Sequence, residues 1–168
     1  MKPALTLIFR CAALALALLA TAACSATDPA AALPAPAPGF DWTVDGRAVT
    51  TTITQSQKFS TTILVSGTVN PGGPVTSRVA LEIPPVAGSY TFSPSSVATA
   101  TYTTSTGSTS AVYYAGANPV AGTVTGSGIV VVTAATATNV RGTFSFTGVD
   151  AATGLSKQVS GGQFNVGL

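Results

Sequence analysis

From residue 40 onward, apolar and polar side chains alternate with a period close to two, and this period constrains the fold more than any other feature. In residues 78–83 the odd positions hold Val, Leu and Ile, and the even positions hold Arg, Ala and Glu. In residues 142–148 both phenylalanines fall on one parity. Side chains two residues apart point to the same face of an extended chain. The pattern therefore predicts β-strands that bury one face.

Clusters of turn-forming residues separate these segments. Asp45-Gly46 is a strong two-residue hairpin signal, and residues 70–74, 116–119 and 150–154 are rich in Gly, Pro, Asn and Asp. About eight short strands with such spacing predict an all-β domain, a single antiparallel β-sandwich or a closed β-barrel. Residues 129–132, Ile followed by three Val, suggest a strand buried on both faces. The expected strands are Phe40–Val44, Arg47–Ile53, Lys58–Val69, Arg78–Ile83, Gly88–Ser93, Val97–Thr104, Thr109–Ala115, Gly122–Ala134, Val140–Val149 and Lys157–Val166.

The N-terminal segment has the features of an export signal. Lys2 and Arg10 precede an apolar run of about ten residues, too short to span a membrane, and Ala22-Ala23 lies directly before Cys24. This arrangement resembles a bacterial lipoprotein precursor, which implies cleavage before Cys24 and lipidation of that cysteine. Thr21 departs from the pattern, because Leu is commonest there. Ser25 resembles the sorting pattern for the outer membrane.

The chain thus divides into three expected parts. Residues 1–23 form the signal peptide, residues 24–39 a lipid-anchored linker rich in Ala and Pro, and residues 40–168 one β domain. Alternating Ala and Pro favour an extended polyproline II conformation, which makes the linker a semi-rigid spacer. The expected location is the bacterial outer membrane, with the membrane itself as a partner through the lipid.

Charge argues against nucleic acid as a partner. The precursor has a formal charge of +2, but removal of Lys2 and Arg10 leaves five cationic and five anionic side chains. A chain with no net charge and no basic stripe lacks the electrostatic footprint of a nucleic-acid-binding protein. Thr and Ser supply the polar surface instead, which suits β-structure.

The residue inventory also limits the chemistry. The chain has no histidine, and its two cysteines are Cys11, inside the signal, and Cys24. No Ser-His-Asp triad, Cys–His pair or histidine metal site can form, so we expect no catalytic residues, no metal and no cofactor. A carboxylate pair is the remaining route to hydrolysis. Its candidates are Asp41, Asp45, Glu82 and Asp150.

Four aromatic side chains are candidates for ligand contact. Trp42 lies near the start of the domain, and Tyr102, Tyr113 and Tyr114 lie in the expected middle hairpin. Tyr113 and Tyr114 are adjacent, so they point to opposite faces of a strand and one ring is expected to be exposed. Exposed aromatic rings can stack on sugars or peptides.

The second half of the chain resembles a known family. The segments Gly88–Phe92, Gly122–Val132, Val140–Phe146 and Val159–Val166 recur in this order in the DUF6252 type of small lipoproteins from Bacteroidetes. The resemblance spans residue 40 to the end and is most specific in residues 142–146 and 162–166. It implies an outer-membrane lipoprotein with a β-rich body, and it supplies no catalytic residues because the family's function is not established.

Three functions follow as expectations. The first is a lipid-anchored β-domain of the cell envelope with a non-enzymatic binding or structural role, whose partner is a protein, a glycan or a small molecule. The second is a lipocalin-like carrier of a small apolar ligand, and the third a carboxylate-dependent hydrolase using Glu82 or Asp150. The carrier predicts a cavity, whereas a sandwich predicts that the same side chains fill the space. Those side chains are Val79, Leu81, Ile83, Phe144 and Phe146.

Overall fold

The computed structural model describes residues 37–70, 72–118 and 124–168, which form eleven strands and no helix. The predicted all-β, antiparallel fold is therefore confirmed. The expected signal peptide, Cys24 and residues up to 36 lie outside the described residues. No helix in the described ranges is long and apolar enough to cross a membrane. The strands are β1 Gly39–Val44, β2 Arg47–Thr50, β3 Ile53–Lys58, β4 Ile63–Val69, β5 Val75–Ile83, β6 Gly88–Phe92, β7 Thr99–Thr106, β8 Thr109–Ala115, β9 Ser127–Ala135, β10 Asn139–Asp150 and β11 Ser156–Gly167.

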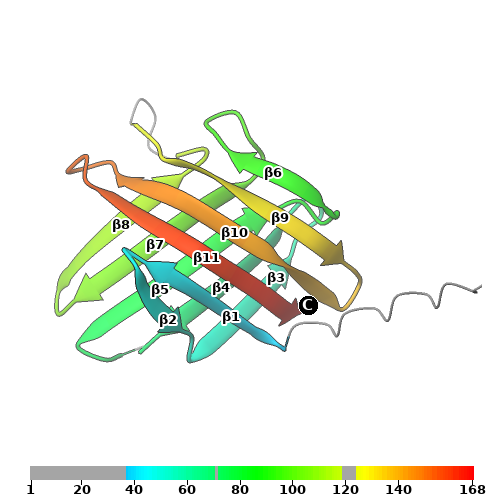
Figure 1. Ribbon diagram of the computed structural model, residues 1–168, viewed down its shortest axis with the longest axis horizontal. Coiled ribbons are helices and arrows are strands. Elements are labelled where there is room, and N and C mark those ends of the chain that lie inside the picture. Colours follow the sequence, from blue (N-terminus) through cyan, green and yellow to red (C-terminus); the bar gives the residue numbers. More distant parts are fainter. Residues whose placement is uncertain (1–36, 71, 119–123) are drawn as a thin grey trace, which may run out of the picture. The chain divides into compact units, whose positions relative to one another are not determined.

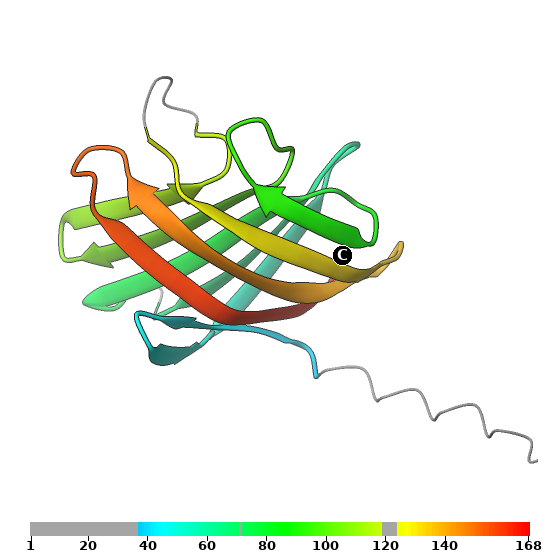
Figure 2. The ribbon, with the colours of Figure 1, turned by 45° about the horizontal axis from the view of Figure 1, so that its top comes forward.

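The strands form one curled antiparallel sheet, a half-barrel whose two layers face each other. Hydrogen bonding runs in the order β2-β1-β11-β10-β8-β7-β5-β4-β3, with β9 and β6 added beside β10. Figure 1 shows β1, β11, β10, β9 and β6 as a front layer and β3, β4, β5, β7 and β8 behind it. Figure 2 shows the two layers from a different angle. The layers join at β10, which pairs with β9 through residues 140–147 and with β8 through Val149 and Asp150.

The structure has eleven strands, more than the estimate of about eight and one more than the ten segments named from the sequence, because β3 forms between the expected segments Arg47–Ile53 and Lys58–Val69. Lys58–Val69 contains a hairpin in which the Phe59 N–H donates to the Thr62 carbonyl (2.8 Å), so β3 ends at Lys58 and β4 begins at Ile63. Residues 59–62 are Phe, Ser, Thr and Thr, without Gly, Pro or Asn, which is why composition did not mark the turn. Arg47–Ile53 likewise divides between β2 and β3.

The hairpin of β1 and β2 forms where Asp45-Gly46 predicted it. Both residues have positive φ, 46° and 81°, as a type I′ turn requires. Val44 pairs with Arg47 across the turn, which fixes the register of both strands. Asp tolerates the left-handed region better than most residues with a side chain, and Gly has no penalty there.

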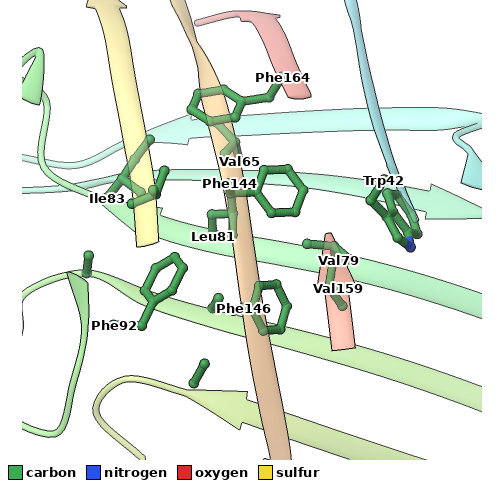
Figure 3. Close-up of a cluster of buried hydrophobic side chains, with 14 of the residues drawn as sticks. Trp42, Val65, Val79, Leu81, Ile83, Phe92, Phe144, Phe146, Val159 and Phe164 are labelled. Carbon is green, nitrogen blue, oxygen red and sulfur yellow. The ribbon is translucent and has the colours of Figure 1, made fainter. Parts of the chain in front are cut away.

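The core lies between the two layers and contains the apolar side chains that the alternation predicted. Val79, Leu81 and Ile83 are fully buried on β5, and Phe144 and Phe146 on β10 are 3% exposed. Figure 3 shows these side chains pointing toward one another from opposite layers. The ring centroid of Phe144 lies 5.2 Å from the ring centroid of Phe40 and 6.3 Å from that of Phe146. These are contact distances for aromatic rings.

Two glycines make room for the phenylalanines of this core. Phe144 pairs with Gly162 across β10 and β11, and Gly142 pairs with Phe164 two residues away. A Cβ on Gly162 would lie 2.5 Å from the Phe144 ring, and one on Gly142 would lie 2.7 Å from the Phe164 ring. Each ring therefore lies on the bare backbone of the facing glycine.

One burial prediction was wrong. Val130 and Val132 are buried, but Ile129 is 39% exposed and Val131 is only half-buried. The reason is that β9 lies in a layer with one face in solvent, so only every second side chain reaches the core.

Candidate functional site

The outward side chains of β3, β4, β5, β7 and β8 form a continuous polar surface, which we call the back-layer face. Cross-strand pairing aligns them in rows, and one row joins all five strands. Adjacent strands lie about 4.8 Å apart, so a five-strand row spans about 19 Å. Its members are mostly amide, hydroxyl and phenol groups. They are Gln55, Ser66, Ala80, Thr101 and Tyr114.

A cleft of about 400 Å³ opens at the β3 end of this row. Its volume lies within the range of small-molecule sites, about 300–1,000 Å³. One cation, one leucine, two glutamines and two serines line it. They are Arg78, Leu64, Gln55, Gln57, Ser56 and Ser66. The hydroxyl of Ser56 donates to the Gly167 carbonyl of β11.

Arg78 is the one charged group in the cleft. Its Nη2 donates to the Oγ of Ser66 at 3.2 Å; Ser66 is only 1% exposed, whereas Arg78 itself is exposed. Glu82 shares the outward face of β5 but lies four residues, about 13 Å, along the strand, where it accepts from Thr62. No carboxylate of the described residues lies within ion-pair distance of Arg78.

The structure separates the four predicted aromatic contacts. Trp42, Tyr102 and Tyr113 point into the core and are 2%, 5% and 6% exposed, so protein covers their rings. Tyr114 points outward onto the back-layer face and is half-buried. The two adjacent tyrosines therefore point to opposite faces as expected, but the outward ring, Tyr114, is half-buried and not exposed.

Trp42 carries a buried donor without an acceptor. Its Nε1–H has no hydrogen-bond partner among the described residues, although the ring is 2% exposed. Figure 3 shows this nitrogen on the side of the ring turned away from Phe144. A buried N–H without a partner costs about 1–3 kcal/mol, so an ordered water is the expected acceptor.

The predicted carboxylate candidates do not come together. Glu82 lies on the outward face, whereas Asp150 is 8% exposed on the inward parity of β10, where its Oδ1 accepts from the N–H groups of Ala152 and Thr153. Asp45 forms an ion pair with Lys157 at the end of the front layer. The described part of the chain contains no group of three or more His, Cys, Asp and Glu residues that could hold a metal.

The Asp45–Lys157 pair shifts both titrating groups. The hydrogen bond from the Lys157 ammonium lowers the pKa of the Asp45 carboxyl; burial opposes this shift, and the N–H of Gln158 assists it. The same hydrogen bond raises the pKa of Lys157. The two side chains are 45% and 37% exposed, so water screens their attraction.

Chemically, the back-layer face is suited to hydrogen bonding rather than to proton transfer. Its donors and acceptors are amides and hydroxyls, with one guanidinium in the cleft and one phenol at the other end of the row. The sequence analysis identified Tyr114 but missed the cleft. Gln55 and Ser66 are 11 residues apart, and only the pairing of β3 with β4 brings them together.

Residues 38–166 match the family described as a domain of unknown function (DUF6252), and the chain belongs to this family. The match covers the β domain up to the last residues of β11 and confirms the family resemblance seen in the sequence. No curated protein and no solved structure matches the chain.

Proposed function

We propose that this DUF6252 protein is a non-enzymatic binding domain, held at the bacterial outer membrane by lipid on Cys24, and that it binds saccharide on the back-layer face. The observation that carries the proposal is the five-strand row that ends in Tyr114 and borders the Arg78 cleft. Saccharides present many hydroxyls and flat C–H faces, so amides, hydroxyls and an accessible aromatic ring are the groups that recognise them.

The anchor part of the proposal rests on the sequence. The basic start, the short apolar run and Ala22-Ala23 before Cys24 favour lipidation, and Ser25 favours the outer membrane. Acyl chains contribute about 0.8 kcal/mol for each buried methylene, so several chains make attachment effectively permanent. A polyproline II linker from Ser25 to Gly39 would place the domain at most about 45 Å from the membrane.

The carrier alternative needs a change in the core. Val79, Leu81, Ile83, Phe144 and Phe146 belong to one packed cluster, so an apolar ligand between the layers would have to displace some of them. Trp42 is the single tryptophan and lies in that cluster. An apolar ligand that enters should change its fluorescence, whereas a saccharide on the back-layer face should not.

Lipidation is tested by intact mass and membrane fractionation of the full chain beside Cys24→Ala. We expect a wild-type mass that corresponds to cleavage before Cys24 plus acyl chains, and a variant that lacks both the lipid and the membrane association. A soluble, unmodified wild-type chain would contradict the anchor and would implicate Thr21.

The binding face is tested by affinity electrophoresis of the full chain, purified in detergent, through gels that contain envelope polysaccharides. Tyr114→Ala should weaken retardation about fivefold to tenfold, because a ring contact contributes about 1 kcal/mol. Gln163→Ala is the matched control, since Gln163 is exposed on the outward face of the front layer. Equal retardation of both variants and the wild type would refute the assignment of this face.

A further inference from the structure

The Arg78 cleft has a charge that the rest of the back-layer face lacks. Among the described residues of that face only Arg78 and Glu82 are charged, and only Arg78 lines the cleft. Glu82 already accepts a hydrogen bond from Thr62 at 2.9 Å. The cleft therefore offers one positive charge to a ligand, with no internal anion to neutralise it.

Ser66 contacts one edge of the Arg78 guanidinium. A guanidinium has five N–H donors, and the structure assigns one contact of Arg78 to the Ser66 hydroxyl. Arg78 is exposed, so its other donors can reach a ligand in the cleft, which Gln55 and Gln57 also line. An arginine held at one edge presents its remaining donors as a planar fork, which is the geometry that binds a carboxylate through two parallel hydrogen bonds.

We propose that the cleft binds the carboxylate of an acidic saccharide, with Arg78 as the residue that selects for charge. The proposal rests on the proposed saccharide-binding function and adds the ligand class. The amides of Gln55 and Gln57 would bond the hydroxyls that flank the carboxylate, and Leu64 would contact the C–H face of the same sugar. A neutral sugar would leave the guanidinium without an anion, so it should bind more weakly.

The test compares polygalacturonate with neutral dextran by calorimetry on the full chain in detergent. Arg78→Gln should weaken polygalacturonate binding about tenfold or more and leave dextran binding unchanged. Arg78→Lys keeps the charge but loses the fork, so it should give a smaller loss. Arg141→Gln is the matched control, because it removes the same charge from the outward face of the front layer.

Competition separates a carboxylate site from a phosphate site. Free galacturonate should displace the polymer from the wild type, and inorganic phosphate at the same concentration and ionic strength should not. Displacement by phosphate alone, or equal losses in Arg78→Gln and Arg141→Gln, would overturn the proposal.

The outcomes also separate this inference from the proposed function. If both polymers bind equally, Arg78→Gln has no effect and Tyr114→Ala weakens both, then saccharide binding stands and the acidic ligand is wrong. If neither polymer binds a chain whose Trp42 fluorescence and cooperative unfolding show that it is folded, both proposals fail for these ligands.

Discussion

The substitution Gly162→Ala should test the packing of the core more sharply than any truncation. Gly162 lies opposite Phe144 on β10, and an added Cβ would meet three ring atoms of Phe144 at 2.5 to 2.6 Å. Carbon atoms pack best at about 3.5–4.0 Å, so the ring would have to move by about 1 Å.

Phe144 has little room to make that movement. Its ring is 3% exposed, and the ring centroids of Phe40, Phe146 and Phe164 lie 5.2, 6.3 and 6.3 Å away. Overpacking of this kind costs about 1–3 kcal/mol. An unstrained glycine-to-alanine change in contrast gains about 0.4–1 kcal/mol, because alanine has less conformational freedom in the unfolded chain.

The assay is urea unfolding followed by the fluorescence of Trp42, which is buried and is the single tryptophan. Gly167→Ala is the control on the same strand, since the nearest atom to its added Cβ is 3.8 Å away. Gly162→Ala should lose stability, and Gly167→Ala should be neutral or slightly stabilising. In a double-mutant cycle, Phe144→Leu should recover part of the loss. Equal stability of the two alanine variants, or an additive cycle, would refute the reasoning.

Two further predictions concern the front-layer turn and the adjacent tyrosines. Asp45→Asn keeps a residue that tolerates positive φ but removes the partner of Lys157; we expect a loss below about 1 kcal/mol that shrinks in high salt, measured by urea unfolding. Because the folded pKa of Asp45 is lowered, the pair's contribution is present at neutral pH and is lost as the pH falls below about 4, so wild type and Asp45→Asn should converge there. Tyr113→Ala should cost about 3–5 kcal/mol, as truncation of a buried ring does, whereas Tyr114→Ala should cost less than about 1 kcal/mol. Comparable losses for the two tyrosines would contradict the inward and outward assignment.

The period of two predicted which face of a strand is buried wherever polar residues separate apolar ones. Val79, Leu81 and Ile83 all lie inward, as the alternation of β5 requires. The same signal was available for Trp42, because Asp41 and Thr43 flank it and Phe40 shares its parity. Trp42 was a candidate ligand contact because of its residue type. Its position in the alternation predicts instead that it is buried, as the structure shows.

Pairing between distant strands could not be predicted in the same way. β6 pairs with β9, about 40 residues further along the chain, and β10 changes partner from β9 to β8 within its own length. The pairing partner of a strand depends on how whole layers pack. The local alternation of apolar and polar residues carries no information about that packing. The row from Gln55 to Tyr114 depends on one such pairing, β5 with β7 across the intervening β6, and on the registers of three hairpins that join consecutive strands.

The separation of core and face has a consequence for how the proposed ligand is recognised. On β5 the odd residues from Val79 to Ile83 hold the layers together, while Arg78 points outward and is not needed for that packing. Removal of its charge should therefore change binding without unfolding the domain. Because residues 24–168 have no formal net charge, the domain exerts little long-range attraction on an anion. We therefore expect Arg78→Gln to raise the dissociation rate more than it lowers the association rate, since a single short-range contact acts mainly after encounter.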